Sequence, residues 1–164
     1  MTVVVRPAAA GDWPALWRII EPVVRAGETY TYPRDLDEAG AKALWTGLPG
    51  YTVLVAANRA GEILGTARFG PNQPGPGSHV ANASFMVAAS ARGQGVGRLL
   101  GEAVIAQAAQ AGFRSMQFNA VVEANHAAVA LWRSLGFEII GTAPEAFDHP
   151  REGLVGLHVM HRRL

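Results

Sequence analysis

The chain has 164 residues, of which 49% are hydrophobic and 16% are charged, a composition typical of a folded globular protein rather than a disordered one. Its formal net charge of +1 gives no electrostatic basis for binding nucleic acid or an anionic membrane surface. The absence of cysteine excludes disulfides, a cysteine-based zinc site and a cysteine acyl-enzyme. Because no apolar run approaches the roughly 20 residues of a membrane span and no signal peptide is recognisable, we expect a cytoplasmic protein.

The N-terminal half is predicted to contain strands and two helices. Strands are expected at Val3–Val5, Thr52–Ala57 and Ile63–Phe69. The first helix is predicted to start near Asp12, and Pro22 is expected to perturb or end it. Asp35 is a candidate cap for a second helix that runs to about Leu48. Gly61 lies in the turn between two of the strands, where it can adopt a positive φ.

The C-terminal half alternates strands with amphipathic helices. Strands are expected at His79–Val87, Arg114–Val122, Phe137–Gly141 and Leu154–Met160. A helix from Val96 to Ala111 is predicted to bury a stripe made of Leu100, Ala103, Val104, Ala108 and Ala111. Asn125 is predicted to cap a further helix that ends at Gly136. With no internal repeat and no linker, residues 1–164 are interpreted as one α+β domain.

The most informative motif is the glycine-rich turn Arg92-Gly93-Gln94-Gly95-Val96-Gly97-Arg98, which lies between a predicted strand and a predicted helix. Glycines let a backbone approach a ligand closely, and the free N–H groups of a helix start favour an anion. Arginines at a helix start oppose the helix dipole unless an anion is bound there. The turn therefore predicts a pyrophosphate site, although a tight strand–helix turn with incidental arginines remains an alternative. A dinucleotide fingerprint and a P-loop both fit the spacing less well.

This turn resembles the acetyl-CoA signature of the GCN5-related N-acetyltransferase (GNAT) superfamily, Arg/Gln-x-x-Gly-x-Gly/Ala. A second motif of that superfamily follows at the expected distance, formed by Asn125, Ala128, Leu131, Trp132 and Gly136-Phe137. The resemblance covers nearly the whole chain and implies a central mixed, mostly antiparallel sheet with helices on both faces. More narrowly, Pro74-Gly75, Ser78-His79, Asn82-Ala83, Phe118-Asn119 and Leu131-Trp132 resemble the branch of the yeast azetidine-2-carboxylate (proline-analogue) acetyltransferase.

The resemblance implies that acetyl-CoA is the co-substrate and that no metal is required. The residues that it places around acetyl-CoA are Phe85, Met86, Val87, Arg92, Gly93, Gln94, Gly95, Val96, Gly97, Arg98, Asn125, Ala128 and Trp132. Backbone groups of the first three are expected to hold the acetyl carbonyl and pantetheine, and the glycine-rich turn the pyrophosphate. For Asn125, capping a helix is an equally good interpretation, and the two roles are compatible.

The chemistry expected is direct attack of an amine on the thioester, which needs a base because an ammonium ion has no free lone pair. Many relatives place a carboxylate on the strand before the turn, but His79–Val87 contains none. Asn82 and Asn119 are candidates for ordering a water or holding the acceptor, and His79 is a weaker candidate for the base. Many relatives also use a tyrosine as general acid where this chain has Trp132, so solvent or another residue must protonate the thiolate.

The acceptor is predicted to be the amine of a small molecule, in particular an amino or imino acid or an analogue of one. Glu28, Tyr30 and Tyr32 lie in the loop that lines the acceptor pocket in this superfamily, and Asp148-His149-Pro150 is a candidate for the opposite wall. The alternatives are a peptide N-terminus, an aminoglycoside, a polyamine, or a catalytically inactive acyl-CoA sensor. By analogy with the superfamily, a homodimer paired through the C-terminal strands is expected.

Overall fold

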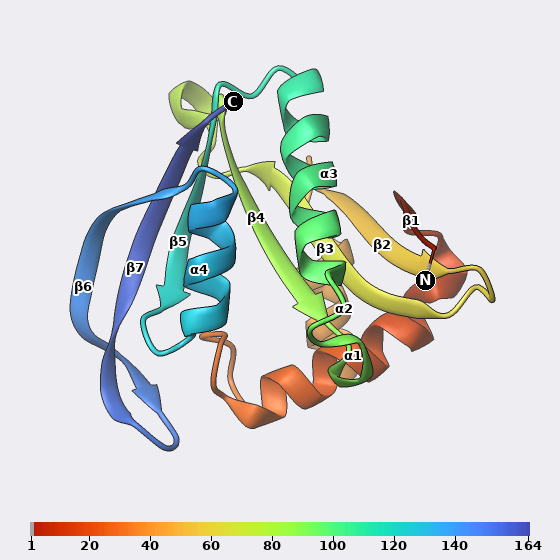
Figure 1. Ribbon diagram of the computed structural model, residues 1–164, viewed down its shortest axis with the longest axis horizontal. Coiled ribbons are helices and arrows are strands. Elements are labelled where there is room, and N and C mark those ends of the chain that lie inside the picture. The colour runs from red at the N-terminus through yellow and green to blue at the C-terminus, as the bar shows by residue number, and fades with distance from the viewer. Residues whose placement is uncertain (1) are drawn as a thin grey trace.

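A computed structural model describes residues 2–164, which build one seven-stranded sheet in the order β1-β2-β3-β4-β5-β7-β6 (Figure 1). The strands are β1 (Val3–Pro7), β2 (Thr52–Asn58), β3 (Ile63–Pro71), β4 (Val80–Val87), β5 (Ser115–Val122), β6 (Glu138–His149) and β7 (Gly153–Arg163). The helices are α1 (Trp13–Ala26), α2 (Glu38–Thr46), α3 (Val96–Gln110) and α4 (His126–Ser134). All neighbouring strands are antiparallel except β4 and β5. The predicted mixed, mostly antiparallel sheet is therefore confirmed.

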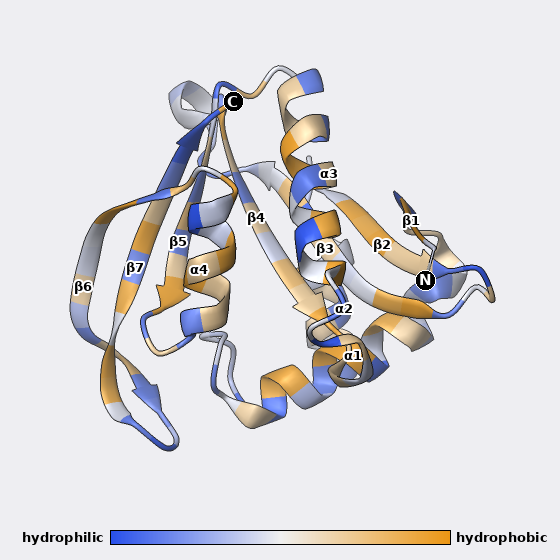
Figure 2. Cartoon of the chain, in the orientation of Figure 1, coloured by the Kyte–Doolittle hydropathy of each residue, from blue (hydrophilic) through white to orange (hydrophobic). Residues whose placement is uncertain are grey.

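Helices cover both faces of this sheet, and each face has its own hydrophobic core. On one face, α3 and α4 pack against β2–β5 and β7 through residues such as Leu100, Val104 and Met160. On the other, α1 and α2 enclose a second cluster that includes Leu16, Ile20 and Trp45. Hydrophobic residues accordingly colour much of the central strands (Figure 2).

The pairing of β4 with β5 is short. Only Val80 with Ser115 and Ala81 with Met116 are in register, at the start of both strands. The two strands then separate toward their carboxyl ends, and Figure 1 shows the gap between them on the side where both arrows end. The carboxyl-terminal half of β4 therefore has a strand partner, β3, on one side only.

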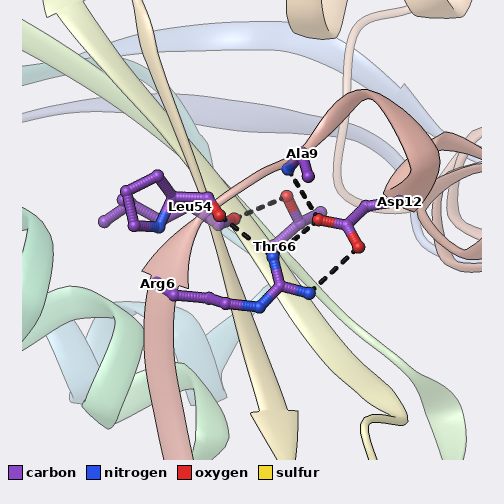
Figure 3. A network of polar contacts seen from close by, with 6 residues as sticks. Arg6, Ala9, Asp12, Leu54 and Thr66 are labelled. Carbon is purple, nitrogen blue, oxygen red and sulfur yellow. Dashed lines mark hydrogen bonds and ion pairs between the residues drawn. The ribbon is translucent and has the colours of Figure 1, made fainter.

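A polar network fixes the chain where β1 turns into α1 (Figure 3). The Arg6 guanidinium donates to both carboxylate oxygens of Asp12, at 2.7 and 3.0 Å, and one of these oxygens also accepts the Ala9 N–H at 2.7 Å. The hydrogen bond from Arg6 holds the pKa of Asp12 below its ordinary value. Asp12 thus fixes the turn before the helix, and its side chain does not cap α1 itself.

Two helix boundaries in the N-terminal half differ from those considered in the prediction. Pro22 does not end α1, which continues to Ala26 and closes at Gly27 with φ of 64°. The burial of Ile20 and Val24 against the sheet offsets the loss of one N–H donor at the proline. The cap of α2 is Asp37 rather than Asp35, because its carboxylate accepts the Gly40 N–H at 2.7 Å.

Three further boundaries in the C-terminal half differ from prediction. His79 precedes β4, and Ala111 is exposed because α3 ends at Gln110. The closing strands are much longer than predicted, since β6 and β7 extend to a hairpin turn between His149 and Gly153. Two irregularities in their pairing, near Gly141 and between Ala143 and Phe147, interrupt the regular alternation of a strand, so the sequence pattern does not show the full length of β6 and β7.

Candidate active site

The glycine-rich turn connects the carboxyl end of β4 to the first turn of α3, as its position in the sequence predicted. Gly93 and Gly95 have φ of 75° and 79°, a conformation that side chains disfavour, and a Cβ at either would meet no atom within 4 Å. The two glycines are therefore needed for backbone shape, and the space around them is open. The start of α3 has no side-chain cap and no acidic residue in its first turn. Its N–H groups and dipole are available to an anion.

The two arginines of the turn lie differently. Arg92 is exposed at the turn itself. Arg98 extends toward α4, where it donates to the Ser134 hydroxyl at 2.7 Å and lies 3.6 Å from the Glu102 carboxylate. Arg98 therefore lies on the rim between α3 and α4 and is already partly neutralised by its own helix.

Two glycines of α3 allow α4 to pack closely against it. A Cβ at Gly97 would lie 3.4 Å from Leu131, and one at Gly101 would lie 2.8 Å from Leu135 and 3.1 Å from Trp132. Gly97 was predicted from the family motif, whereas Gly101 was not among the predicted residues. Gly101 lies four residues after Gly97 and therefore on the same face of the helix. This spacing was the indication in the sequence that another helix packs closely there.

The unpaired edge of β4 is occupied by a tyrosine from the α1–α2 loop. The Tyr30 hydroxyl accepts the Phe85 N–H at 2.9 Å and donates to the Phe85 carbonyl at 2.7 Å. Burial raises the pKa of Tyr30, with a smaller contribution from Tyr32, so the hydroxyl stays protonated at neutral pH. Tyr30, predicted for the acceptor pocket, and Phe85, predicted for the acetyl group, are thus brought together at one point.

Aromatic rings fill the gap between β4 and β5 on the α4 side. Trp132 packs against Phe85 and Phe118 with ring centroids 4.6 and 4.9 Å apart, and Phe118 stacks on Phe137 at 4.3 Å. Trp132 is 7% exposed and belongs to the hydrophobic core on the α3–α4 side. Any ligand that enters between the two strands meets these rings as an apolar floor.

Side chains along β4 alternate between the two faces of the sheet. Ala81, Ala83, Phe85 and Val87 belong to the α3–α4 side, and Met86 packs with α1 and α2 on the other. By the same alternation, Asn82 and Ser84 face the α1–α2 side. The Asn82 amide oxygen accepts the Ala83 N–H at 2.8 Å.

The remaining catalytic candidates are not gathered at Phe85. Asn119 is exposed and donates to the Asn72 amide at 2.6 Å, in the loop before β4. His79 is also exposed, at the paired end of β4. His79 and Phe85 are six residue steps apart, roughly 20 Å along an extended strand.

The three predicted acceptor-loop residues lie on the α1–α2 side. The rings of Tyr30 and Tyr32 stack 5.3 Å apart, and Glu28 forms an ion pair with Arg151 at 3.1 Å. That ion pair connects the loop to the β6–β7 turn, next to the predicted opposite wall. Burial also raises the pKa of Tyr32, while the nearby Arg68 opposes this shift.

Arg68 is the main residue near this loop that the sequence analysis missed. It lies on β3 opposite Ser84 and donates to the Tyr32 hydroxyl at 3.0 Å and to the Leu44 carbonyl. Its guanidinium also lies over the rings of Trp45 and Tyr51, 5.3 and 5.4 Å from their centroids. A charged residue inside the otherwise uncharged segment Ile63–Phe69 was the indication available in the sequence.

Two other properties bear on the type of site. Within residues 2–164, no group of three or more histidine, cysteine or acidic side chains is arranged to hold a metal ion. None of the helices in the same range is long and apolar enough to cross a bilayer.

Comparison with known proteins identifies the class to which this site belongs. Residues 13–137 match the model of the acetyltransferase (GNAT) family. A solved GCN5-related N-acetyltransferase from Kribbella flavida is 54% identical, with a TM-score of 0.95 over 99% of this chain and 98% of that one. The L-methionine sulfoximine/L-methionine sulfone acetyltransferase of Pseudomonas aeruginosa is 32% identical over 148 residues, 88% of this chain and 86% of that protein.

Two further solved structures share the fold over the full chain. A ribosomal-protein-alanine N-acetyltransferase from Brucella melitensis is 30% identical, with a TM-score of 0.86 and coverage of 98% and 99%. A phosphinothricin acetyltransferase from Sinorhizobium meliloti, in complex with AcCoA, is 26% identical, with a TM-score of 0.87 and coverage of 100% and 89%. The chain therefore belongs to the GNAT family and is an N-acetyltransferase of that family.

Proposed function

We propose that this chain transfers the acetyl group of acetyl-CoA directly to the amine of a small amino acid or amino-acid analogue. The observation that carries the proposal is the opening between β4 and β5, where the Phe85 backbone is on the unpaired edge of β4 and the glycine-rich turn leads from the end of that strand to the uncapped start of α3. An acyl donor with a pyrophosphate needs both features, a hydrogen-bond donor for its carbonyl and an anion site for its phosphates. The AcCoA complex of the Sinorhizobium meliloti relative supports this choice of donor.

The residues present fit acetyl-CoA. The first-turn N–H groups of α3 would hold the pyrophosphate, because no side chain caps them and the space around Gly93 and Gly95 is open. The Phe85 N–H would hold the acetyl carbonyl. The Tyr30 oxygen, 2.9 Å from that nitrogen, indicates that an oxygen atom fits at this point.

The reaction follows from these placements. The acceptor amine attacks the thioester carbon, negative charge develops on the acetyl oxygen, and the Phe85 N–H stabilises it. Collapse of this intermediate breaks the carbon–sulfur bond and releases the CoA thiolate. Since Trp132 stands where many relatives have a tyrosine, solvent protonates the thiolate. The proton lost by the amine goes to a water on the acceptor side, where Asn82 is the candidate to order it.

The substrate class is supported by two relatives. The Pseudomonas aeruginosa and Sinorhizobium meliloti relatives are named for acetylation of methionine sulfoximine, methionine sulfone and phosphinothricin, all of them amino-acid analogues. Azetidine-2-carboxylate, the substrate of the narrower branch that the sequence resembles, is a member of the same class. The name of the Brucella melitensis relative favours a second candidate, the N-terminal alanine of a protein.

The test is release of free CoA, followed with a thiol reagent, from acetyl-CoA and a panel of amines. The panel contains methionine sulfone, methionine sulfoximine, phosphinothricin, azetidine-2-carboxylate, a polyamine, an aminoglycoside and a peptide that begins with alanine. Release with one or more of the first four, and not with the others, is the expected result. Selective release with the peptide would support the second candidate instead. Binding of acetyl-CoA without turnover of any amine would indicate a sensor, and absence of binding would contradict the proposed function.

We also propose that the protein forms a homodimer through its C-terminal strands. β6 is an edge strand of the sheet, and two of the large exposed hydrophobic residues, Ile140 and Leu154, lie on β6 and β7 at 58% and 61% exposure. Light scattering should give a dimer mass that Ile140→Glu reduces to a monomer. A monomeric mass for the unmodified chain would contradict this proposal.

A further inference from the structure

Arg68 differs from the paired arginines of this chain in its electrostatic environment. Four arginines form ion pairs with carboxylates, Arg6, Arg25, Arg98 and Arg151, and their side chains are 41–73% exposed. Arg68 is only 8% exposed, yet no carboxylate in residues 2–164 lies within ion-pair distance of it. A buried cation without an anion is costly, and it is uncommon where the charge has no ligand to bind.

Arg68 also has N–H donors that find no acceptor among residues 2–164. A guanidinium has five N–H donors. Two hydrogen bonds to described residues are formed, to the Leu44 carbonyl and the Tyr32 hydroxyl, and the buried Nε has no acceptor within residues 2–164. The rings of Trp45 and Tyr51 hold the guanidinium plane in place, so the unused donors have a defined direction.

Arg68 lies close to the edge where acetyl transfer is proposed. It is paired across the β3–β4 ladder with Ser84, the residue before Phe85, and both face the α1–α2 side. Through Tyr32 it also supports the stacked pair with Tyr30, whose hydroxyl lies on the Phe85 backbone. Arg68 therefore points to the α1–α2 side of the sheet, from a backbone position whose partner on β4 is the residue next to the proposed oxyanion donor.

We infer that Arg68 binds the carboxylate of the acceptor, so that the enzyme selects amines that carry an adjacent carboxylate. This inference rests on the proposed function and specifies the acceptor as an α-amino or imino acid. A planar guanidinium matches a carboxylate in shape and charge, and the aromatic walls exclude water that would weaken the contact. In such an acceptor the amine is two bonds from the carboxylate carbon, which holds it close to Phe85.

The test measures two acceptors with each of two forms of the enzyme, so that the effect of the acceptor charge can be compared between the forms. L-Methionine sulfone is compared with its carboxamide, in which only the negative charge is removed, using the unmodified chain and Arg68→Gln. For the unmodified chain, the carboxamide should lower kcat/KM by at least tenfold, mainly through KM. For Arg68→Gln, the two acceptors should differ by less than threefold. Arg68→Lys should restore part of the preference, because it keeps the charge but not the planar fork.

Controls separate recognition from folding. Arg59→Gln, at an exposed hairpin turn, should retain the full preference for the carboxylate. Thermal unfolding and the Kd for acetyl-CoA should be measured for each variant, because Arg68 also contacts the end of α2. If Arg68→Gln does not fold, the unmodified chain still provides a test. 4-(Methylsulfonyl)butanoate, which lacks the amine, should inhibit competitively against methionine sulfone, and the corresponding alcohol should not.

Three results would overturn the inference. In the first, Arg68→Gln folds and retains the preference for the carboxylate. In the second, the variant loses activity equally with both acceptors. In the third, the unmodified chain acetylates the carboxamide as well as the amino acid, which would leave the proposed acetyltransferase function intact while removing the carboxylate site. Failure of the unmodified chain to acetylate any amine would instead contradict the proposed function together with this inference.

Discussion

Helices α3 and α4 both begin at the open end of the gap between β4 and β5, but their first turns are built differently (Figure 1). α4 is capped within the chain, because the Asn125 side chain accepts the Ala128 N–H at 3.3 Å. α3 follows Gly95 in the left-handed conformation and has no side-chain cap. The two helices pack side by side through Gly97 and Gly101, so their first turns are compared at the same place in the molecule. The difference indicates that the start of α3 is shaped for a ligand and that of α4 for stability.

The largest effect on donor binding is expected from Gly95→Ala. A side chain at φ of 79° costs about 1–2 kcal/mol, and the altered turn should raise the Kd for acetyl-CoA by roughly tenfold or more. Gly112→Ala is the matched control, because Gly112 also has positive φ and open space around its Cβ but lies beyond the far end of α3. Calorimetric titration and thermal unfolding should show equal destabilisation of both variants and weaker binding in Gly95→Ala alone. Equal Kd values would remove the distinction between the two helix starts.

Tyr30→Phe tests the β4 edge between the two helix starts. The Tyr30 hydroxyl occupies the Phe85 N–H, so the acetyl carbonyl must displace it to reach the same amide. One hydrogen bond is worth about 1 kcal/mol net, and its removal should tighten acetyl-CoA binding about threefold to tenfold. Because burial raises the pKa of Tyr30, the Kd of the unmodified chain should not change through this group between pH 7 and 9. Weaker binding by Tyr30→Phe would show instead that the hydroxyl contacts the donor.

A smaller effect is expected at the rim between α3 and α4. Arg98→Gln should raise the Kd for acetyl-CoA about threefold and reduce its dependence on salt, since one exposed positive charge is lost. Glu102→Gln should act in the opposite direction, because it removes the carboxylate 3.6 Å from Arg98. Neither variant should change the free energy of unfolding by more than about 0.5 kcal/mol. Shifts of the same sign in both Kd values would mean that Arg98 does not act through its charge.

The smallest effect on binding is expected from Asn125→Ala. Loss of the cap should lower the free energy of unfolding by about 1 kcal/mol while the Kd for acetyl-CoA changes less than threefold. Asn125→Ser keeps a capping oxygen and should restore most of the stability. If Asn125→Ser is stable but binds acetyl-CoA poorly, Asn125 has the cofactor role that the family resemblance implies.

The glycine-rich turn, the cap at Asn125 and the alternation along β4 could be read from the sequence, because each depends on residues close together in the chain. Local sequence patterns did not predict that α1 continues through Pro22, because the continuation depends on burial of the helix face against the sheet. They also did not predict the full length of β6 and β7, where bulges interrupt the period of two.

The amino-acid sequence by itself determined the class of enzyme and predicted the anion site, since a glycine-rich turn and the helix start that follows it are close together in the chain. Only the tertiary structure decided what lies on the other side of β4. The Tyr30–Phe85 contact joins residues 55 apart in the chain, and the Arg68–Tyr32 contact joins residues 36 apart. Both depend on where the α1–α2 loop meets the sheet. The burial that leaves Arg68 without a carboxylate is a property of that packing and not of any local motif.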